Sequence, residues 1–271
     1  MPDCIGFFPN DVIYTLEDLF FIFKYPDGYN TEMTPTSLTE LLTPGARNLP
    51  KPALGSRFSL AASLTTSVLL LQACGILHKA LEPKNILFFK RGEYSTVELT
   101  TPFLFGFDYA RPHGQGFPSL QFGKPDNKPD DGPPEITARP SREEIITQVR
   151  QKNTQWNEDY QFHVHPNYSM YSEYSQRYLK IFDIYSLGVM LYQVGVWKDL
   201  LDIAVVESAV VDNYPRIRKN HIRNALLGSL SDLAADMGDI YAFVVARCLT
   251  SDIAHEGMPT EPVPVSFFRC G

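Results

Sequence analysis

Polar side chains capable of chemistry are concentrated in one short segment, Leu77 to Phe89, which reads LHKALEPKNILFF. An imidazole, two ammonium groups, a carboxylate and a carboxamide occur there in the order His78, Lys79, Glu82, Lys84 and Asn85. Enzymes use such groups as acids, bases and charge stabilisers when the fold holds them together. Ala80 stands inside this series and offers no functional group. The function of the segment therefore depends on what Ala80 replaces.

A second group, His163-Val164-His165, has the spacing that would place two imidazoles on one side of a strand. Two imidazoles could supply two of the four ligands that a zinc site needs. We favour a structural role for both histidines and predict no metal site in the chain.

Three segments in sequence order resemble the C-terminal lobe of a protein kinase. The loop matches the kinase catalytic loop at His78, Leu81, Pro83, Asn85, Ile86 and Leu87. Leu104 to Arg111, LFGFDYAR, is similar to the Leu-x-Asp-Phe-Gly-x-Ala-Arg segment that follows it in kinases. Asp183 to Val189, DIYSLGV, resembles the opening of the buried central helix of that lobe. The order and spacing of the three imply a protein-kinase-like fold.

The resemblance is closest to kinase-like regions of filamentous-fungal signalling proteins. These share the loop, the GFDYAR and DIYSLG segments, and a Gly-x-Trp after the central helix, here Gly195-Val196-Trp197. The likeness covers residues 19–249 and implies a nearly complete helical C-lobe with a truncated N-lobe. Only the last N-lobe strands and the hinge are expected, because these residues contain neither a Gly-x-Gly-x-x-Gly loop nor a Val-Ala-x-Lys strand.

The same resemblance implies that phosphoryl transfer is lost. Ala80 replaces the catalytic aspartate, Glu82 replaces the loop lysine, and Gly106 replaces the aspartate that holds magnesium. A positioned acid or base typically contributes about two to four orders of magnitude in rate. We therefore expect no catalytic residue and no cofactor. ATP and Mg²⁺ would bind only if the chain is an active kinase, and Asn85 and Asp108 would then be the candidate cofactor-binding residues.

Two retained residues have structural roles in the resembled family. The histidine equivalent to His78 packs and hydrogen-bonds inside the lobe, and the aspartate equivalent to Asp183 binds backbone amides of the catalytic loop. Leaving such buried donors unpaired costs about 1–3 kcal/mol. The resemblance thus implies that His78 and Asp183 serve folding and that Asn85 holds the loop closed, while Asp108 is best interpreted as a turn residue.

The elements that would position these residues follow from apolar periodicity. Residues 57–73 carry the stripe of a long helix, which Gly75 would end as a left-handed cap. A second long helix, buried on most sides, is predicted over 182–197, and a short helix capped by Ser37 over 37–42. Further helices are expected within 200–233 and 240–249, and strands at 19–25, 86–89, 96–99 and 103–108.

We predict an α+β fold, mainly α, of the protein-kinase-like type. Residues 1–30 would hold the remnant N-lobe strands and the hinge, and residues 31–254 the C-lobe. Within the C-lobe, residues 112–134 are rich in Pro, Gly and Asp, which predicts an irregular insertion. Residues 255–271 are predicted to form a flexible tail.

Composition narrows the partners and the compartment. A net charge of -7 argues against nonspecific nucleic-acid binding. The longest apolar run, near residues 67–74, is much shorter than the roughly 20 residues that cross a bilayer, and no signal segment opens the chain. Cys74 and Cys248 have apolar neighbours and are expected to be buried free thiols. We expect an intracellular, cytoplasmic protein with no nucleic-acid or membrane partner.

Three functions follow from these observations. The leading one is a catalytically inactive pseudokinase that acts as an interaction or regulatory module for unidentified protein partners. The first alternative is an active ATP-dependent protein kinase with divergent catalytic residues. The second is a C-lobe fragment without function, which would expose apolar patches and aggregate.

Overall fold

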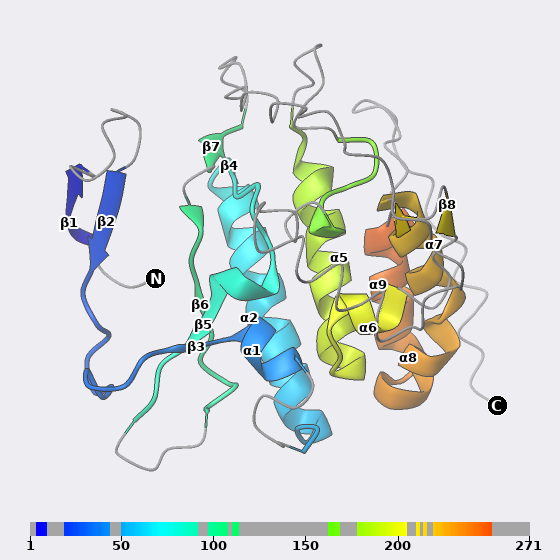
Figure 1. Ribbon diagram of the computed structural model, residues 1–271, viewed down its shortest axis with the longest axis horizontal. Coiled ribbons are helices and arrows are strands. Elements are labelled where there is room, and N and C mark those ends of the chain that lie inside the picture. The colour runs from blue at the N-terminus through cyan, green and yellow to red at the C-terminus, as the bar shows by residue number, and fades with distance from the viewer. Residues whose placement is uncertain are drawn as a thin grey trace.

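The computed structural model describes residues 4–9, 19–43, 50–91, 97–107, 110–113, 162–168, 178–204, 210–211, 214–215 and 219–250. Helices form most of this part of the chain, and the strands within residues 4–112 lie to one side of them, whereas the strand at residues 210–211 lies on the opposite side (Figure 1). The described residues therefore form a mixed α and β structure that is mainly helical, as predicted.

The helices are α1 (Leu38–Leu42), α2 (Leu54–Ala73), α5 (Lys180–Val196), α6 (Leu200–Ala204), α7 (Lys219–Gly228), α8 (Leu230–Met237) and α9 (Asp239–Thr250). A 3₁₀ turn, η1, spans Pro83–Asn85. The strands are β1 (Cys4–Pro9), β2 (Leu19–Phe23), β3 (Thr36–Ser37), β4 (Ile76–Leu77), β5 (Ile86–Phe88), β6 (Phe103–Leu104), β7 (Arg111–Pro112), β8 (Val210–Val211) and β9 (Tyr214–Pro215).

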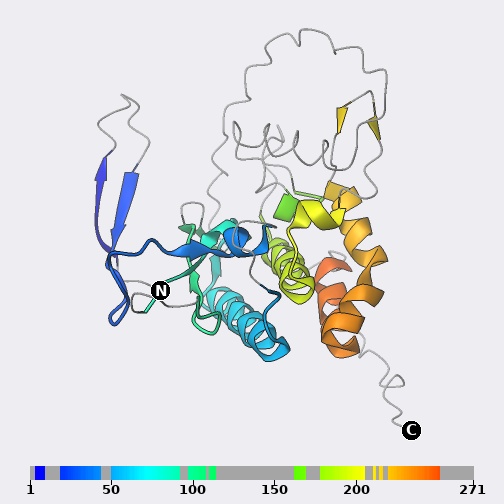
Figure 2. The same ribbon diagram turned by 60° about the horizontal axis from the view of Figure 1, so that its bottom comes forward.

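The strands form four small antiparallel groups. β1 and β2 make a hairpin, with Phe7 opposite Phe21, that stands apart from the helices (Figures 1 and 2). β5 lies between β3 and β6, and β4 pairs with β7. β8 pairs with β9, a pairing that the sequence pattern did not indicate. The β3–β5–β6 and β4–β7 groups hold both ends of the segment 77–88.

Helix α2 contains the predicted apolar stripe and begins at Leu54, before its expected start at residue 57. Its inward side buries Arg57, Leu60, Ala61, Leu64 and Val68, and Gly75 follows the helix with φ +72°. Among the described helices, α2 alone is long and apolar enough to cross a membrane by length and composition. The apolar run 67–74 did not predict a helix of this kind. Core helices of soluble proteins and signal sequences can have the same length and composition.

Helix α5 lies at the centre of the apolar core and is buried on nearly every side, as predicted. It packs against α2, α8 and α9. Gly188 allows α9 to approach, because a Cβ at this position would lie 2.6 Å from the Cβ of Cys248. The close helix packing therefore depends on the missing side chain at Gly188.

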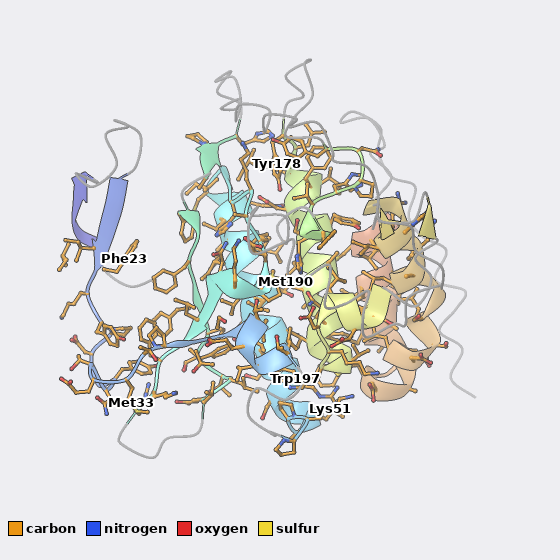
Figure 3. The ribbon with its side chains drawn as sticks, in the orientation of Figure 1. Phe23, Met33, Lys51, Tyr178, Met190 and Trp197 are labelled. Atoms are coloured by element: carbon orange, nitrogen blue, oxygen red, sulfur yellow. The ribbon has the colours of Figure 1, made fainter. Side chains whose placement is uncertain are left out.

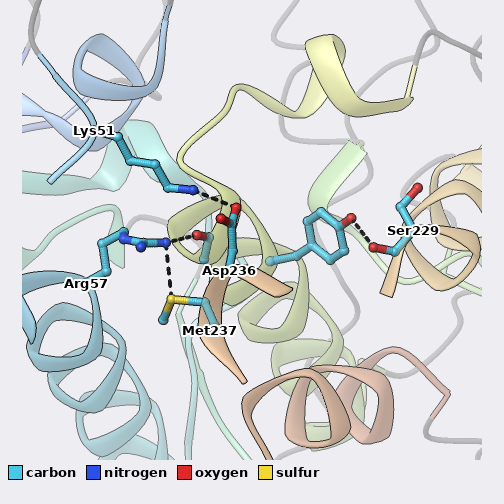
Figure 4. A network of polar contacts seen from close by, with 7 residues as sticks. Lys51, Arg57, Ser229, Asp236 and Met237 are labelled. Atoms are coloured by element: carbon cyan, nitrogen blue, oxygen red, sulfur yellow. Dashed lines mark hydrogen bonds and ion pairs between the residues drawn. The ribbon is translucent and has the colours of Figure 1, made fainter. Parts of the chain in front are cut away.

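A polar network ties α2 to α5 and α8 (Figure 4). The buried Arg57 guanidinium donates to the carbonyl oxygen of Gly195 and to the Met237 sulfur, the latter at 3.2 Å. On the more exposed side, Lys51 forms an ion pair with Asp236. Because the last carbonyl groups of a helix carry partial negative charge, the Arg57 cation is well placed at the end of α5.

Several local predictions are wrong, and the strand expected at 103–108 ends at Leu104. Residues 97–99 of the expected strand 96–99 are not a strand, and a turn begins at Leu99. The expected insertion 112–134 starts too early, because Pro112 belongs to β7 and pairs with Ile76. Cys74 is exposed rather than buried, since it follows the outward-facing Leu70 by one helical turn.

Candidate functional site

The loop between β4 and β5, residues 78–85, is held at both ends by strand pairing. β4 leads into it from α2, and η1 closes it before β5. Lys79 has φ +70°, a left-handed conformation that costs a residue other than glycine roughly 1–3 kcal/mol. Further contacts must therefore hold the backbone of the loop in this shape.

Asp183, in the first turn of α5, supplies these contacts. One carboxylate oxygen accepts from the backbone N–H of His78 at 2.8 Å, and the other accepts from the N–H of Lys79 at 3.0 Å. The Tyr178 hydroxyl donates to the second oxygen at 2.8 Å. This is the contact between helix and loop that the sequence resemblance implied. Burial raises the pKa of Asp183, and the three hydrogen bonds and the nearby Lys79 charge oppose that rise.

His78 is buried and neutral. Its Nε2 lies 2.9 Å from the carbonyl oxygen of Phe105, and its Nδ1 accepts from the N–H of Ala80 at 3.3 Å. These partners assign the proton to Nε2. Burial lowers the pKa of His78 to about 4, although the bond to Phe105 acts in the other direction. The ring thus joins the loop to the segment after β6 without carrying charge.

Asn85 closes the loop from its C-terminal end. Its amide nitrogen donates to the carbonyl oxygen of Ala80 at 2.8 Å and lies 3.4 Å from a carboxylate oxygen of Glu82. Its backbone oxygen accepts from the N–H of Phe105 at 2.8 Å. Asn85 therefore joins three parts of the site through its own side chain and backbone.

The Asn85 side chain also fills the space next to Gly106. Gly106 has φ +80°, and a Cβ built there would collide with the amide group of Asn85. Both the backbone conformation and the neighbouring amide exclude an ordinary side chain at this position. Asp108, the second candidate for cofactor binding, lies outside the described residues.

Ala80 is 2% exposed and packs in an apolar cluster with Leu77, Val164, Tyr168, Tyr178 and Phe182. The carboxylate that this loop does contain belongs to Glu82, which is buried and forms an ion pair with Lys84 at 2.9 Å. The Lys79 ammonium lies over the Tyr178 ring, 5.4 Å from its centre. The centre of the loop is thus packed with apolar and paired groups.

Aromatic rings connect the N-terminal segment to this site. Phe23, at the end of β2, meets Phe105 edge to face at 5.4 Å, and Tyr25 meets Phe89 at 5.0 Å (Figure 3 labels Phe23 and Tyr178). Tyr29 contacts both Phe89 and Phe103, and Arg91 lies over its ring. The contact between Phe23 and Phe105 therefore joins the hairpin to the segment that hydrogen-bonds to the 78–85 loop.

The two histidines considered for zinc have separate partners. His163 lies 2.8 Å from the Gln193 side-chain oxygen, and His165 accepts from the N–H of Asn167 at 3.1 Å while its ring packs on Phe182. Residues 162–163 are helical, so the strand spacing assumed from the sequence does not apply. Within the described ranges, no group of three or more histidine, cysteine, aspartate or glutamate side chains could hold a metal ion.

Sequence reasoning missed three members of the site. Phe105 contributes a carbonyl oxygen, which any residue type supplies, so its sequence carries no signal. Tyr178 donates to Asp183 through its hydroxyl, and no sequence feature links these two residues. Glu82 was interpreted as a reversed charge, although the nearby Lys84 indicated a local ion pair.

No protein-family model and no curated protein matches this chain.

Proposed function

We propose that the chain is a protein-kinase-like domain without phosphoryl-transfer activity, which acts as an interaction or regulatory module for protein partners. One observation carries the proposal: Asp183 binds the backbone of a loop whose central position is a buried alanine, Ala80. The fold keeps the contacts that shape the loop. A methyl group packed among aromatic rings can neither orient nor deprotonate a substrate hydroxyl.

The packing around Gly106 supports the same conclusion. In the resembled family an aspartate at this place holds magnesium. Here the position has no side chain, and the amide of Asn85 occupies the neighbouring space. The Asn85 nitrogen is also engaged with the loop carbonyl of Ala80. The amide therefore serves to hold the loop closed.

The aromatic contact across the hinge gives further support. The resembled family binds ATP between its hinge strand and its catalytic loop. In this chain the ring of Phe23 contacts the ring of Phe105, which lies in the segment after β6 and hydrogen-bonds to the loop through Asn85, and the ring centres are 5.4 Å apart. An edge-to-face ring pair contributes about 0.5–1.5 kcal/mol beyond its area burial, so a nucleotide that separated the rings would have to offset this energy.

A nucleotide titration tests the proposal. Melting temperature is measured for the full chain at increasing MgATP concentration, with transfer of the γ-phosphate to a protein substrate followed in parallel. We expect a cooperative melt that MgATP leaves unchanged, because a ligand stabilises a fold only in proportion to its binding. A saturable rise in melting temperature together with phosphate transfer would overturn the proposal.

An active kinase is the second candidate, and the Glu82 carboxylate beside Asn85 is the observation that favours it. This candidate requires ATP and Mg²⁺ and predicts that Glu82→Gln and Asn85→Ala both abolish transfer. Glu82→Gln keeps the size of the side chain and removes its charge. A wild-type chain that melts cooperatively and transfers no phosphate excludes this candidate.

A further inference from the structure

Helix α9 exposes a stripe of apolar side chains. Ile240 is 70% exposed, Phe243 55% and Val244 44%, while Ala242, Val245 and Leu249 on the opposite side are buried. The exposed residues follow i, i+3 and i+4 spacing and therefore share one face of the helix. We call this face the α9 stripe.

The stripe continues onto α2. Phe58 is 41% exposed and meets Tyr241 of α9 edge to face at 5.6 Å, and Leu54, one helical turn earlier, is also exposed. The only charged residue of α2 is Arg57, which is turned into the core. Helix α2 thus adds exposed apolar side chains beside α9 and no exposed charge of its own. Single exposed apolar residues are common, but a contiguous group on a folded domain marks an interaction surface.

The charges at the ends of the α9 stripe indicate what covers it. Asp239 lies in the first turn of α9 and Arg247 in the last. Both share the exposed face, and Phe243 is midway between them. If two such helices pack antiparallel about a twofold axis at Phe243, Asp239 of each copy faces Arg247 of the other. Twofold interfaces pair residues reciprocally in this way.

We propose that a second copy of this chain covers the α9 stripe, forming a twofold dimer centred on Phe243. The apolar side chains supply the driving force, and the two reciprocal Asp239–Arg247 pairs at the rim fix the antiparallel direction. Helices that bind lipid surfaces carry basic residues beside their apolar face. The α9 stripe instead carries one acidic and one basic end, which suits its own copy.

Sedimentation velocity over a concentration series, on the full chain, tests the proposal. We expect a reversible monomer–dimer equilibrium that Phe243→Asp weakens by about a hundredfold or more, because a buried central aromatic dominates such interfaces. Ile5→Asp is the matched control: Ile5 is 65% exposed on β1, away from the stripe, and its replacement should leave the dimer intact. Val244→Asp repeats the test if Phe243→Asp lacks a cooperative melt.

Charge reversal tests the twofold geometry itself. Asp239→Arg alone and Arg247→Asp alone each place like charges opposite one another twice, so each should weaken the dimer by roughly two- to thirtyfold. The double variant restores both pairs and should recover most of the affinity. Helical circular dichroism accompanies each variant, since both charges also interact with the dipole of α9.

Three results would overturn the proposal. The first is a wild-type chain that stays monomeric up to its solubility limit. The second is a dimer that Phe243→Asp and Val244→Asp leave intact. The third is a double charge variant no tighter than the single ones, which would exclude the antiparallel arrangement.

Discussion

The Asp183 carboxylate accepts hydrogen bonds from three donors at once: the backbone N–H groups of His78 and Lys79 and the hydroxyl of Tyr178. Asp183 is 1% exposed, and its bonds from His78 and Tyr178 are buried, so the carboxylate replaces water as an acceptor for these two donors. The left-handed backbone at Lys79 depends on it as well. A single side chain thus holds the N-terminal part of the loop in its shape.

Replacing this carboxylate should destabilise the fold strongly. We expect Asp183→Ala to lower the free energy of unfolding by about 3 kcal/mol or more, because buried donors lose their acceptor. Urea denaturation measures this loss. Asp236→Ala is the matched control: Asp236 forms a surface ion pair with Lys51, so its removal should cost about 0–1 kcal/mol. Similar losses in the two variants would contradict the assigned role of Asp183.

Neutral His78 makes stability depend on pH. Its folded pKa of about 4 lies below the ordinary value of 6.5, so between these values the unfolded chain binds a proton that the folded chain does not. Stability is therefore expected to fall as pH decreases from about 6.5 towards 4, by about 3 kcal/mol in the limit. Burial raises the pKa of Asp183, so this group acts in the opposite direction as pH falls.

Urea denaturation between pH 7 and 4.5 checks this expectation. In His78→Gln the unfolding free energy should vary less with pH than in the wild-type chain, since the variant lacks the titrating group. Taking the difference between the two chains removes the contribution of other histidines. Equal pH dependence in both would show that His78 titrates normally in the folded chain.

At the scale of elements, the packing of α5 against α9 depends on Gly188. Gly188→Ala would bring a methyl group to 2.6 Å from the Cβ of Cys248, and such overpacking typically costs about 1–3 kcal/mol. Gly228, the last residue of α7, has no atom within 4 Å of an added Cβ. Gly228→Ala should therefore stabilise by about 0.4–1 kcal/mol. Thermal unfolding of both variants checks the opposite signs.

The same elements show how far sequence reasoning reaches. The long helices, the Ser37 cap and the cap at Gly75 are present as predicted, because periodicity and capping are local properties. The strand predicted at 96–99 is wrong in its described part. Short strands form only where a distant segment pairs with them, and the local sequence does not show that partner. The same limit applies to the site. The side chain of Asp183 could be predicted from the sequence, but the backbone carbonyl of Phe105 could not, because every residue type has one.

At the scale of the whole molecule, the β1–β2 hairpin is a separate small unit. A two-stranded hairpin is marginally stable alone. This one stands apart from the helices (Figure 2), and its Ile5 and Ile22 side chains are exposed. The edge contact of Phe23 with Phe105 joins it to the site. Local opening of the hairpin should therefore require less free energy than unfolding of the helical core.

Removing the Phe23 ring tests this separation. In Phe23→Ala, amide hydrogen exchange should accelerate in β1 and β2, while α5 and its neighbours keep their protection and the main melting transition shifts little. Phe88→Ala is the contrasting variant, because Phe88 is fully buried in the core and its loss should cost about 3–5 kcal/mol. Faster exchange in α5 of Phe23→Ala would mean that hairpin and core unfold together.

The contact between Asn85 and Gly106 has a consequence for how the sequence can change over generations. An aspartate introduced at position 106 must adopt a strained φ of +80° and meets an amide that already holds the neighbouring backbone, so it is harmful, and most harmful while Asn85 is present. Altering position 85 first opens the loop. Each single step is unfavourable by itself, so no easy path of single substitutions leads from this arrangement to one with a carboxylate at position 106.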